Sequence, residues 1–305
     1  DFNRIVGPLI NQIKNINFCG NFGDPLLNND LQLMTKMLKE TDIHVDVHTN
    51  GSLRNDKWWA AFPRHLPKNH RVVFAIDGLR DTHSMYRVGT DFDRILENAK
   101  TFIRAGGIAE WCFIKFKHNE HQLQAAEALA KTYGFKYFSS KDSSRFNFEK
   151  RFAVYNRNGE TEYYLEPPTT NTVKFFDVSN LVDVENFINN SEISCYAQHK
   201  KEIYIDAQMQ LWPCCYTASV PYTFVPESDI TKPYHDHSKS SIDSLVKSLG
   251  GYDRINLHNH SIESILNSVE WQTSWEDHWQ KEKLPTCART CGSLPSSIVT
   301  DNKTE

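Results

Sequence analysis

The feature that most constrains this chain is an alternation of short apolar segments with amphipathic segments over residues 1–141. Such alternation predicts right-handed βαβ units and a parallel sheet, and therefore an α/β fold. The clearest helix spans residues 92–103, where apolar residues recur at helical spacing, Asp91 can cap the start and Gly106 can end it. The predicted strands are 15–19, 43–48, 72–76, 110–116 and 135–139, and the other predicted helices are 2–14, 30–40, 55–62 and 120–133.

The alternation stops after residue 141. Residues 142–194 are polar and rich in turn-forming residues, which predicts a bridging segment with some strand. Residues 195–305 form a third part, with a predicted hairpin at 202–213, a loop at 219–241 and a helix at 261–281. Within that helix Trp271, Trp275 and Trp279 are spaced by four residues, which favours packing against a core.

Composition excludes some classes of function. The net charge is −4 and the sequence has no long basic run, which argues against a nucleic-acid partner. Uninterrupted apolar stretches fall short of the roughly 20 residues of a membrane span. The seven cysteines are an odd number in a chain long enough to build its own core. We therefore expect a reducing, cytoplasmic compartment and metal-bound thiolates in place of disulfides.

Polar residues follow the predicted strands, at the edge of a parallel sheet where ligands bind. The loop Gly20-Asn21-Phe22-Gly23-Asp24-Pro25 comes directly after the first strand. Its glycines would let a ligand approach the main chain, and Asp24 could accept a hydrogen bond from an ammonium group. The alternative is an ordinary tight turn between strand and helix. At later strand ends Asn50, Asp77 and Asn119 leave the same choice open between ligand, turn former and helix cap, and Asp77 could accept from ribose hydroxyls.

Five cysteines lie in the C-terminal part and flank turns or prolines. They are Cys195, Cys214, Cys215, Cys287 and Cys291. Thiolates at such places can close a four-ligand site for an iron–sulfur cluster or for zinc, and their spacing does not separate the two. Cys214 and Cys215 are adjacent and, on a strand, would point to opposite faces, so only one should be a ligand. We expect Cys19 and Cys112 to be buried free thiols, because each lies in an apolar strand.

The segment Phe18–Pro25 resembles the glycine-rich motif of radical S-adenosylmethionine (radical SAM) enzymes. Four further stretches match the family in the same order, namely His48-Thr49-Asn50-Gly51, Ala75-Ile76-Asp77-Gly78, His83-Ser84-Met85-Tyr86-Arg87 and Lys117-His118-Asn119-Glu120-His121. The tail resembles the SPASM/twitch extension of the family. The likeness covers residues 1–141 and 195–291.

The resemblance implies a partial (β/α)6 radical SAM barrel in residues 1–141, a bridging segment in 142–194 and a small α+β SPASM/twitch-like iron–sulfur domain in 195–305. It implies an enzyme that reductively cleaves S-adenosylmethionine and abstracts hydrogen from a substrate, for which a peptide or protein is expected. A flavodoxin or ferredoxin would be the electron donor. The implied cofactor-binding residues are Gly20, Asn21, Gly23, Asp24, Asn50, Asp77, Arg87 and Asn119. Cys195, Cys214 or Cys215, Cys287 and Cys291 would hold one auxiliary [4Fe–4S] cluster.

The chain departs from the family at one important point. The Cys-Xaa3-Cys-Xaa2-Cys motif that binds the catalytic [4Fe–4S] cluster is absent, and Cys287-Xaa3-Cys291 cannot replace it because Leu294 stands at the third position. We expect the motif upstream of Asp1, so the chain would be an N-terminally truncated fragment that is inactive alone. Asp24 stands where many members of the family have Glu. Two alternatives remain, a non-catalytic α/β binding module and a different α/β enzyme with a zinc-binding cysteine tail.

Overall fold

The computed structural model describes residues 1–143, 146, 151–156, 158–170, 181–225, 227 and 231–293. The chain divides into two compact units, Asp1–Phe175 and Phe176–Glu305, and each is described here by itself. Part of the predicted bridging segment 142–194 lies outside the described residues, and the predicted division into three parts stays a prediction.

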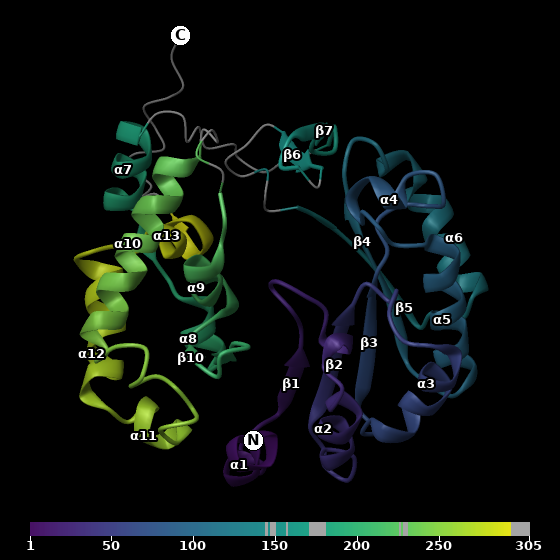
Figure 1. The fold of residues 1–305 in the computed structure, drawn as a ribbon, viewed down its shortest axis with the longest axis horizontal. Helices are drawn as coiled ribbons and strands as arrows, with labels where there is room; N and C mark the ends of the chain where they lie inside the picture. The colour runs from purple at the N-terminus through teal and green to yellow at the C-terminus, as the bar shows by residue number, and fades with distance from the viewer. Residues whose placement is uncertain are drawn as a thin grey trace. The chain divides into compact units, whose positions relative to one another are not determined.

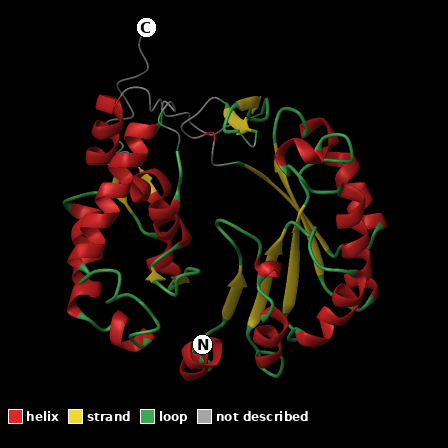
Figure 2. Cartoon of the chain, viewed as in Figure 1, coloured by secondary structure: helices red, strands yellow, loops and turns green. Residues whose placement is uncertain are grey.

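The first unit is built on a five-stranded sheet whose strands follow one another in chain order. Every neighbouring pair is parallel, which confirms the predicted α/β class (Figure 2). The strands are β1 (Asn15–Phe18), β2 (His44–Thr49), β3 (His70–Ala75), β4 (Ala109–Lys115) and β5 (Tyr137–Asp142). Their carboxyl ends therefore share one edge of the sheet.

Helices cover one face of this sheet (Figure 1). They are α1 (Phe2–Val6), α2 (Leu31–Met37), α3 (Asp56–Ala61), α4 (His83–Tyr86), α5 (Phe92–Arg104) and α6 (Leu123–Thr132), with 3-10 turns η1 (Gly7–Leu9), η2 (Pro25–Leu27), η3 (Phe62–His65) and η4 (Glu120–Gln122). The start of α5 is as predicted, since the Asp91 side chain accepts from the Arg94 backbone N–H. Its end is followed by Gly106 at φ +93°, a left-handed conformation that suits glycine.

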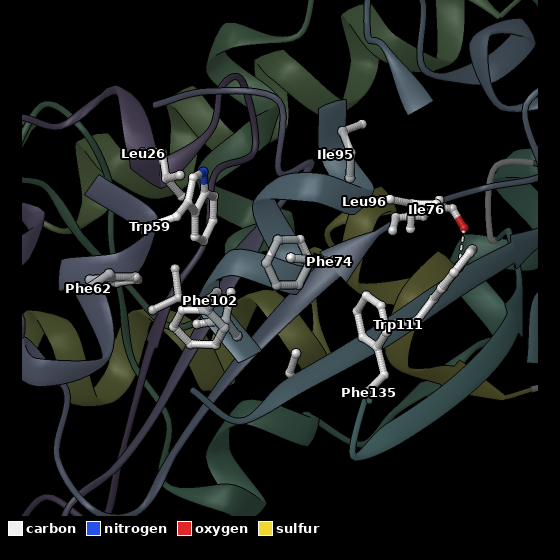
Figure 3. Close-up of a cluster of buried hydrophobic side chains, with 14 of the residues drawn as sticks. Leu26, Trp59, Phe62, Phe74, Ile76, Ile95, Leu96, Phe102, Trp111 and Phe135 are labelled. Atoms are coloured by element: carbon white, nitrogen blue, oxygen red, sulfur yellow. Dashed lines mark hydrogen bonds between the residues drawn. The ribbon is translucent and has the colours of Figure 1, made fainter. Parts of the chain in front are cut away.

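The core between sheet and helices is aromatic. Trp59, Phe62, Phe74, Phe102 and Trp111 are fully buried and belong to one hydrophobic cluster (Figure 3). Burying one side chain of this size stabilises a fold by roughly 1.5–3 kcal/mol. The Trp111 indole N–H donates to the Ile76 carbonyl at 2.8 Å, so its polar atom is satisfied at the end of β3.

Two predictions in this unit are wrong in detail. The helix expected at 2–14 is only α1 followed by η1, because Pro8 has no backbone N–H with which to continue an α-helix. Cys19 is exposed, whereas Cys112 is buried as expected. The reason is position in the sheet: β1 is an edge strand that ends at Phe18, and Cys112 lies in the interior strand β4.

The expected strand in the bridging segment is present as a hairpin. β6 (Phe152–Tyr155) and β7 (Thr161–Leu165) are antiparallel. Leu165 forms a small buried cluster with Phe116 and Phe146 beyond the end of β4. The Tyr163 hydroxyl donates to the Met85 carbonyl at 2.6 Å, so the hairpin is attached to α4 at the carboxyl edge of the sheet.

The second unit is mainly helical. Its described elements are α7 (Leu181–Asn190), β8 (Glu192–Ile193), α8 (Tyr196–Lys200), β9 (Tyr204–Ile205), β10 (Leu211–Trp212), α9 (Cys215–Ser219), η6 (Val220–Tyr222), α10 (Lys232–Ser248), α11 (Ile262–Leu266), α12 (Val269–Gln280), α13 (Pro285–Cys291) and β11 (Gly292–Ser293). β9 and β10 form the predicted hairpin, and β8 pairs antiparallel with β11. In the part of the chain that the structure describes, no helix is long and apolar enough to cross a membrane.

Two further predictions need correction. The end of the segment expected as a loop at 219–241 belongs to α10, because that helix buries Tyr234, Ile242 and Leu245 on one face. The helix expected at 261–281 is two helices, since the Ser268 hydroxyl accepts from the Trp271 backbone N–H and starts α12. Among the three tryptophans of α12, Trp275 is buried as expected for core packing, while the others are half-buried.

Candidate functional site

Asp24 connects the glycine-rich loop to the end of β2. Its carboxylate accepts from the Thr49 hydroxyl at 2.9 and 2.8 Å and from the Asn50 backbone N–H at 2.8 Å. It also caps η2 by accepting from the Leu26 backbone N–H at 3.0 Å. Three hydrogen atoms thus fill three of the roughly four lone-pair positions of a carboxylate. Two motifs that the sequence placed 25 residues apart are joined at this residue.

The two glycines of the loop have different roles. A Cβ atom on Gly20 would lie 2.4 Å from the Gly23 carbonyl oxygen, so the loop can close on itself only with glycine at position 20. A Cβ atom on Gly23 would meet only the Leu27 side chain, at 3.6 Å, which is an ordinary contact. The fold therefore requires Gly20 but does not require Gly23. Asn21 and Gly23 are exposed in the same loop.

Asp77, Arg87 and Asn119 form a second group at the strand ends. The Asp77 carboxylate is fully buried, accepts from the Ile114 backbone N–H at 2.6 Å and pairs with Arg87 Nε at 2.7 Å. Burial raises the pKa of Asp77, and the Arg87 guanidinium acts in the opposite direction. Asn119, also fully buried, donates to the Asp77 and Ile114 carbonyls at 3.2 and 3.0 Å. These contacts tie the ends of β3 and β4 together and leave Arg87 a quarter exposed.

His83 supports this group, and the sequence analysis gave it no role of its own. The Asp77 backbone N–H donates to His83 Nδ1 at 3.2 Å, so Nε2 carries the proton and faces the Thr90 hydroxyl at 3.0 Å. The Thr90 hydroxyl in turn donates to the Arg87 carbonyl at 2.6 Å. Burial, together with the nearby guanidinium of Arg87, lowers the pKa of His83 to about 4.

The other face of the sheet carries a row of charged side chains, which the sequence analysis missed. Arg71 binds Asp46 with two nitrogens, at 2.9 and 2.7 Å, and reaches Glu110 at 2.7 Å. Burial raises the pKa of Asp46, but Arg71 and His44 outweigh it and the net shift is downward. Glu110 also accepts from the Ser139 hydroxyl at 2.5 Å. The polar residues that alternate with valines in β2 were the signal that this face is polar.

The segments that carry Cys195, Cys214, Cys287 and Cys291 contact one another within the second unit. The backbone N–H of Ser194 donates to the Cys291 carbonyl at 3.1 Å, which sets the Cys195 segment beside Cys291. α13, which carries Cys287, packs against α9, whose first residue follows Cys214. Burial raises the pKa of Cys287, and Cys214, Cys195 and Cys291 raise it further.

Cys214 and Cys215 do not lie on a strand as expected. β10 ends at Trp212, Cys214 is the N-cap of α9 and Cys215 is its first helical residue. Pro213 follows Trp212 and has no N–H with which to extend the ladder. Cys214 is the thiol whose charge most strongly affects Cys287. In the described residues, no three His, Cys, Asp or Glu side chains are close enough together to hold a single metal ion.

Thiolates are the ligand type that zinc and iron–sulfur clusters take, and the surroundings of these thiols bear on their ionisation. Cys195 and Cys214 are both N-cap residues of short helices. Burial raises the pKa of Cys195, while the backbone N–H groups of Gln198 and Ala197 favour its thiolate. The neighbouring thiols oppose ionisation of Cys195 and Cys287, and such repulsion is relieved when a cation neutralises the thiolates.

Two open grooves of about 510 and 580 Å³ lie on the first unit. One is lined by Asn55, Asp56, Lys57, Arg94, Glu97 and Asn98, and the other by Leu26, Leu27, Asn29, Leu53, Arg54, Asn55, Trp58 and Arg94. The predicted cofactor-binding residues line neither of them.

Neither the protein-family models nor the curated proteins contain a match to this chain. Solved structures with a similar chain path include SuiB of Streptococcus suis, which is 14% identical with a TM-score of 0.43. The matched region covers 74% of this chain and 57% of the SuiB chain. Native anSMEcpe with bound AdoMet and Cp18Cys peptide is 12% identical with a TM-score of 0.49, and the matched region covers 94% of this chain and 79% of the anSMEcpe chain. SuiB bound to the precursor peptide SuiA is 13% identical with a TM-score of 0.43, and the matched region covers 73% of this chain and 53% of the SuiB chain. The chain thus spans little more than half the length of SuiB, and the assignment of function depends on the chain's own residues.

Proposed function

We propose that residues 1–175 bind S-adenosylmethionine at the carboxyl edge of the parallel sheet, as the cofactor-binding part of a radical SAM enzyme. One observation carries this proposal: the Asp24 carboxylate joins the glycine-rich loop to Thr49 and Asn50. Two of the stretches that resemble the family are therefore in contact, and the contact lies where parallel sheets bind ligands.

Different residues of the chain would bind different parts of the cofactor. The exposed main chain at Asn21 and Gly23 would receive the methionine part of the cofactor, and the remaining lone pair of Asp24 would accept from its ammonium group. The partly exposed Arg87 would face the cofactor's carboxylate, and Asn50 would add an amide side chain at the neighbouring strand end. Figure 1 shows these strand ends on one side of the first unit.

Asp77 and Asn119 would support the binding site without touching the cofactor. Both are fully buried and already hydrogen-bonded inside the protein, so we propose that they hold Arg87 and the ends of β3 and β4 in place. An ion pair fixed by a buried carboxylate keeps a guanidinium in one orientation, which lowers the entropy lost when it binds an anion.

When bound beside a reduced [4Fe–4S] cluster, S-adenosylmethionine supplies a 5′-deoxyadenosyl radical that abstracts hydrogen from a substrate. The 305 residues hold no Cys-Xaa3-Cys-Xaa2-Cys motif, so we propose that this chain alone binds the cofactor but does not cleave it. For a protein that includes such a motif, we propose that the substrate is a peptide and that a flavodoxin or ferredoxin donates the electron.

For the second unit we propose one auxiliary [4Fe–4S] cluster held by Cys195, Cys214, Cys287 and Cys291. The contacts between the segments that carry them and the effect of the other thiols on Cys195 and Cys287 support this set, and Cys215 is the alternative to Cys214. Anaerobic reconstitution with iron and sulfide, followed by metal and labile-sulfide analysis, tests it. Zinc without labile sulfide would support a zinc tail on a different α/β enzyme instead.

Equilibrium dialysis with labelled S-adenosylmethionine tests the first unit. We expect saturable binding that Gly20→Ala abolishes, because the new Cβ atom collides with the Gly23 carbonyl. Gly23→Ala is the matched control for folding, since its Cβ atom fits the free protein. If the cofactor approaches the main chain at this point, Gly23→Ala also weakens binding while leaving amide exchange in the loop unchanged. Absence of saturable binding to the unaltered chain would contradict the proposal.

A further inference from the structure

The larger of the two grooves on the first unit combines positive charge with apolar surface. Its volume is about 580 Å³, and the charged side chains that line it are Arg54 and Arg94. Its apolar surface comes mainly from Leu27, Leu53 and Trp58. Leu27 is 63% exposed, so part of this apolar surface is open to a ligand. The chain as a whole carries a net charge of −4, so the lining of this groove is a local positive region.

Arg54 has a backbone conformation that arginine rarely adopts. Its φ is +69°, in the left-handed region where a residue with a side chain is strained. Its Nη2 donates to the Asn28 carbonyl and to the Asn29 side-chain oxygen, both at 3.1 Å. The guanidinium carbon lies 5.8 Å from the centre of the Trp58 ring. The surrounding contacts therefore hold this guanidinium in one place despite the backbone strain, which is typical of residues with a binding role.

Both arginines of this groove keep hydrogen-bond donors that the protein does not use. Among the residues that the structure describes, Nη1 of Arg54 makes no hydrogen bond and its Nε is buried without an acceptor. The Arg94 guanidinium donates to the Arg54 carbonyl at 3.3 Å. Neither arginine pairs with a carboxylate of the described residues. Because a guanidinium binds a carboxylate through two parallel hydrogen bonds, two unpaired arginines at one groove indicate an anionic ligand.

The second groove continues the first. Both are lined by Asn55 and Arg94, so they meet at these two residues. The second groove is also lined by Lys57, together with the carboxylates of Asp56 and Glu97. An open path longer than one groove suits an extended peptide better than a compact small molecule, which proteins usually enclose. A nucleic acid would need more positive charge along this path than two arginines and one lysine beside two carboxylates.

We propose that the larger groove binds an extended segment of a partner polypeptide in which a carboxylate stands beside a large apolar side chain. Arg54 and Arg94 bind the carboxylate, while Leu27, Leu53 and Trp58 contact the apolar side chain. Arginine and tryptophan are the residue types that contribute most to the binding energy of protein interfaces. The residues proposed to bind S-adenosylmethionine line neither groove, so this site is separate from the cofactor site.

A synthetic array of hexapeptides, probed with the labelled full chain, tests this proposal. Peptides with Asp or Glu next to Leu, Phe or Trp should bind best. The same peptides with Asn or Gln in place of the acid should bind about 10-fold more weakly, because a hydrogen bond to a charged group is lost. This comparison needs no variant of the protein.

Two variants then assign the binding to the groove. Arg94→Gln should bind the acidic peptides about 10-fold more weakly, for the same reason. Arg104→Gln is the matched control and should bind them unchanged, since Arg104 is exposed on the same helix, α5, and lines neither groove. Leu27→Ser should lose the preference for an apolar neighbour and keep the preference for an acid.

Two controls separate this inference from folding and from the cofactor site. Arg94→Gln and Leu27→Ser replace exposed side chains, so both should unfold at the same urea concentration as the unaltered chain. In equilibrium dialysis, Arg94→Gln should bind S-adenosylmethionine as the unaltered chain does, so failure of either proposal leaves the other standing.

Three results would overturn the inference. They are an array on which acidic peptides bind no better than their amide counterparts, equal affinities of Arg94→Gln and Arg104→Gln for the acidic peptides, and displacement of a bound peptide by a short RNA oligonucleotide more readily than by unlabelled peptide. The last result would assign the groove to a nucleic acid.

Discussion

Replacing Asp24 with Asn should loosen the carboxyl edge of the sheet. The carboxylate receives three hydrogen atoms, from Thr49, Asn50 and Leu26. An amide keeps one oxygen, which can serve the Thr49 hydroxyl and one backbone N–H. Its NH2 group must then face the other backbone N–H, donor against donor.

The cost follows from these contacts. A hydrogen bond to a charged group contributes about 1.5–3 kcal/mol, and an unsatisfied donor costs about 1–3 kcal/mol. Asp24 is half-buried, so water can reach the abandoned amide and the lower end of the range applies. We expect Asp24→Asn to lower the free energy of unfolding of the first unit by about 2 kcal/mol.

Urea-dependent amide hydrogen exchange, read by mass spectrometry on peptides from β1 to β3, measures this loss separately from the second unit. Asp30→Asn is the matched control, because Asp30 is an exposed N-cap whose side chain makes no capping hydrogen bond. The control should change the free energy by less than about 0.5 kcal/mol. Equal values for the two variants would show that Asp24 does not hold the loop to β2.

Three further predictions concern acid stability, catalysis and the cysteine ligands. In the folded chain the pKa of His83 is lowered to about 4, whereas in the unfolded chain it is about 6.5. Between these pH values only the unfolded chain protonates this histidine, so the free energy of unfolding falls as the pH drops from about 6.5 to 4. In urea titrations across that range, the loss of about 3 kcal/mol should disappear in His83→Asn and persist in the exposed control His121→Asn; an unchanged profile would contradict the buried neutral form. The reconstituted chain should form no 5′-deoxyadenosine from S-adenosylmethionine and dithionite by chromatography, and formation of that product would show that it carries its own catalytic cluster. Iron analysis after reconstitution should show a loss in Cys214→Ser but not in Cys215→Ser, and the reverse result would exchange the two ligands.

The sheet was predictable from the sequence because its signals are local. Apolar segments of strand length alternate with helical periods, and Asp91 and Gly106 mark the ends of α5 within a few residues of the apolar stripe. The helix α10 was not predicted, because its local sequence signals point to a loop. Its serines and histidines are typical of loops, and only the packing of Tyr234 and Leu245 in three dimensions makes that segment a helix.

The pairings within the site were beyond local signals. Arg71 meets Asp46 and Glu110 across distances of 25 and 39 residues in the sequence, and His83 receives an N–H from a residue on another element. The residue types were visible in the sequence, but which charge neutralises which depends on strand register. The register sets Asp46 opposite Arg71 in the pairing of β2 with β3.

The structure also changes how the glycine-rich loop should be understood. The sequence left a choice between a tight turn and a ligand loop, and the contacts of Asp24 and Gly20 show a tight turn that is also anchored to the next strand end. The two interpretations are compatible, because a loop held by internal bonds keeps its backbone amides in fixed directions and loses little entropy when a ligand binds. Gly23 discriminates between them: the fold has room for a side chain there, so loss of binding in Gly23→Ala with an unaltered loop would assign that space to a ligand.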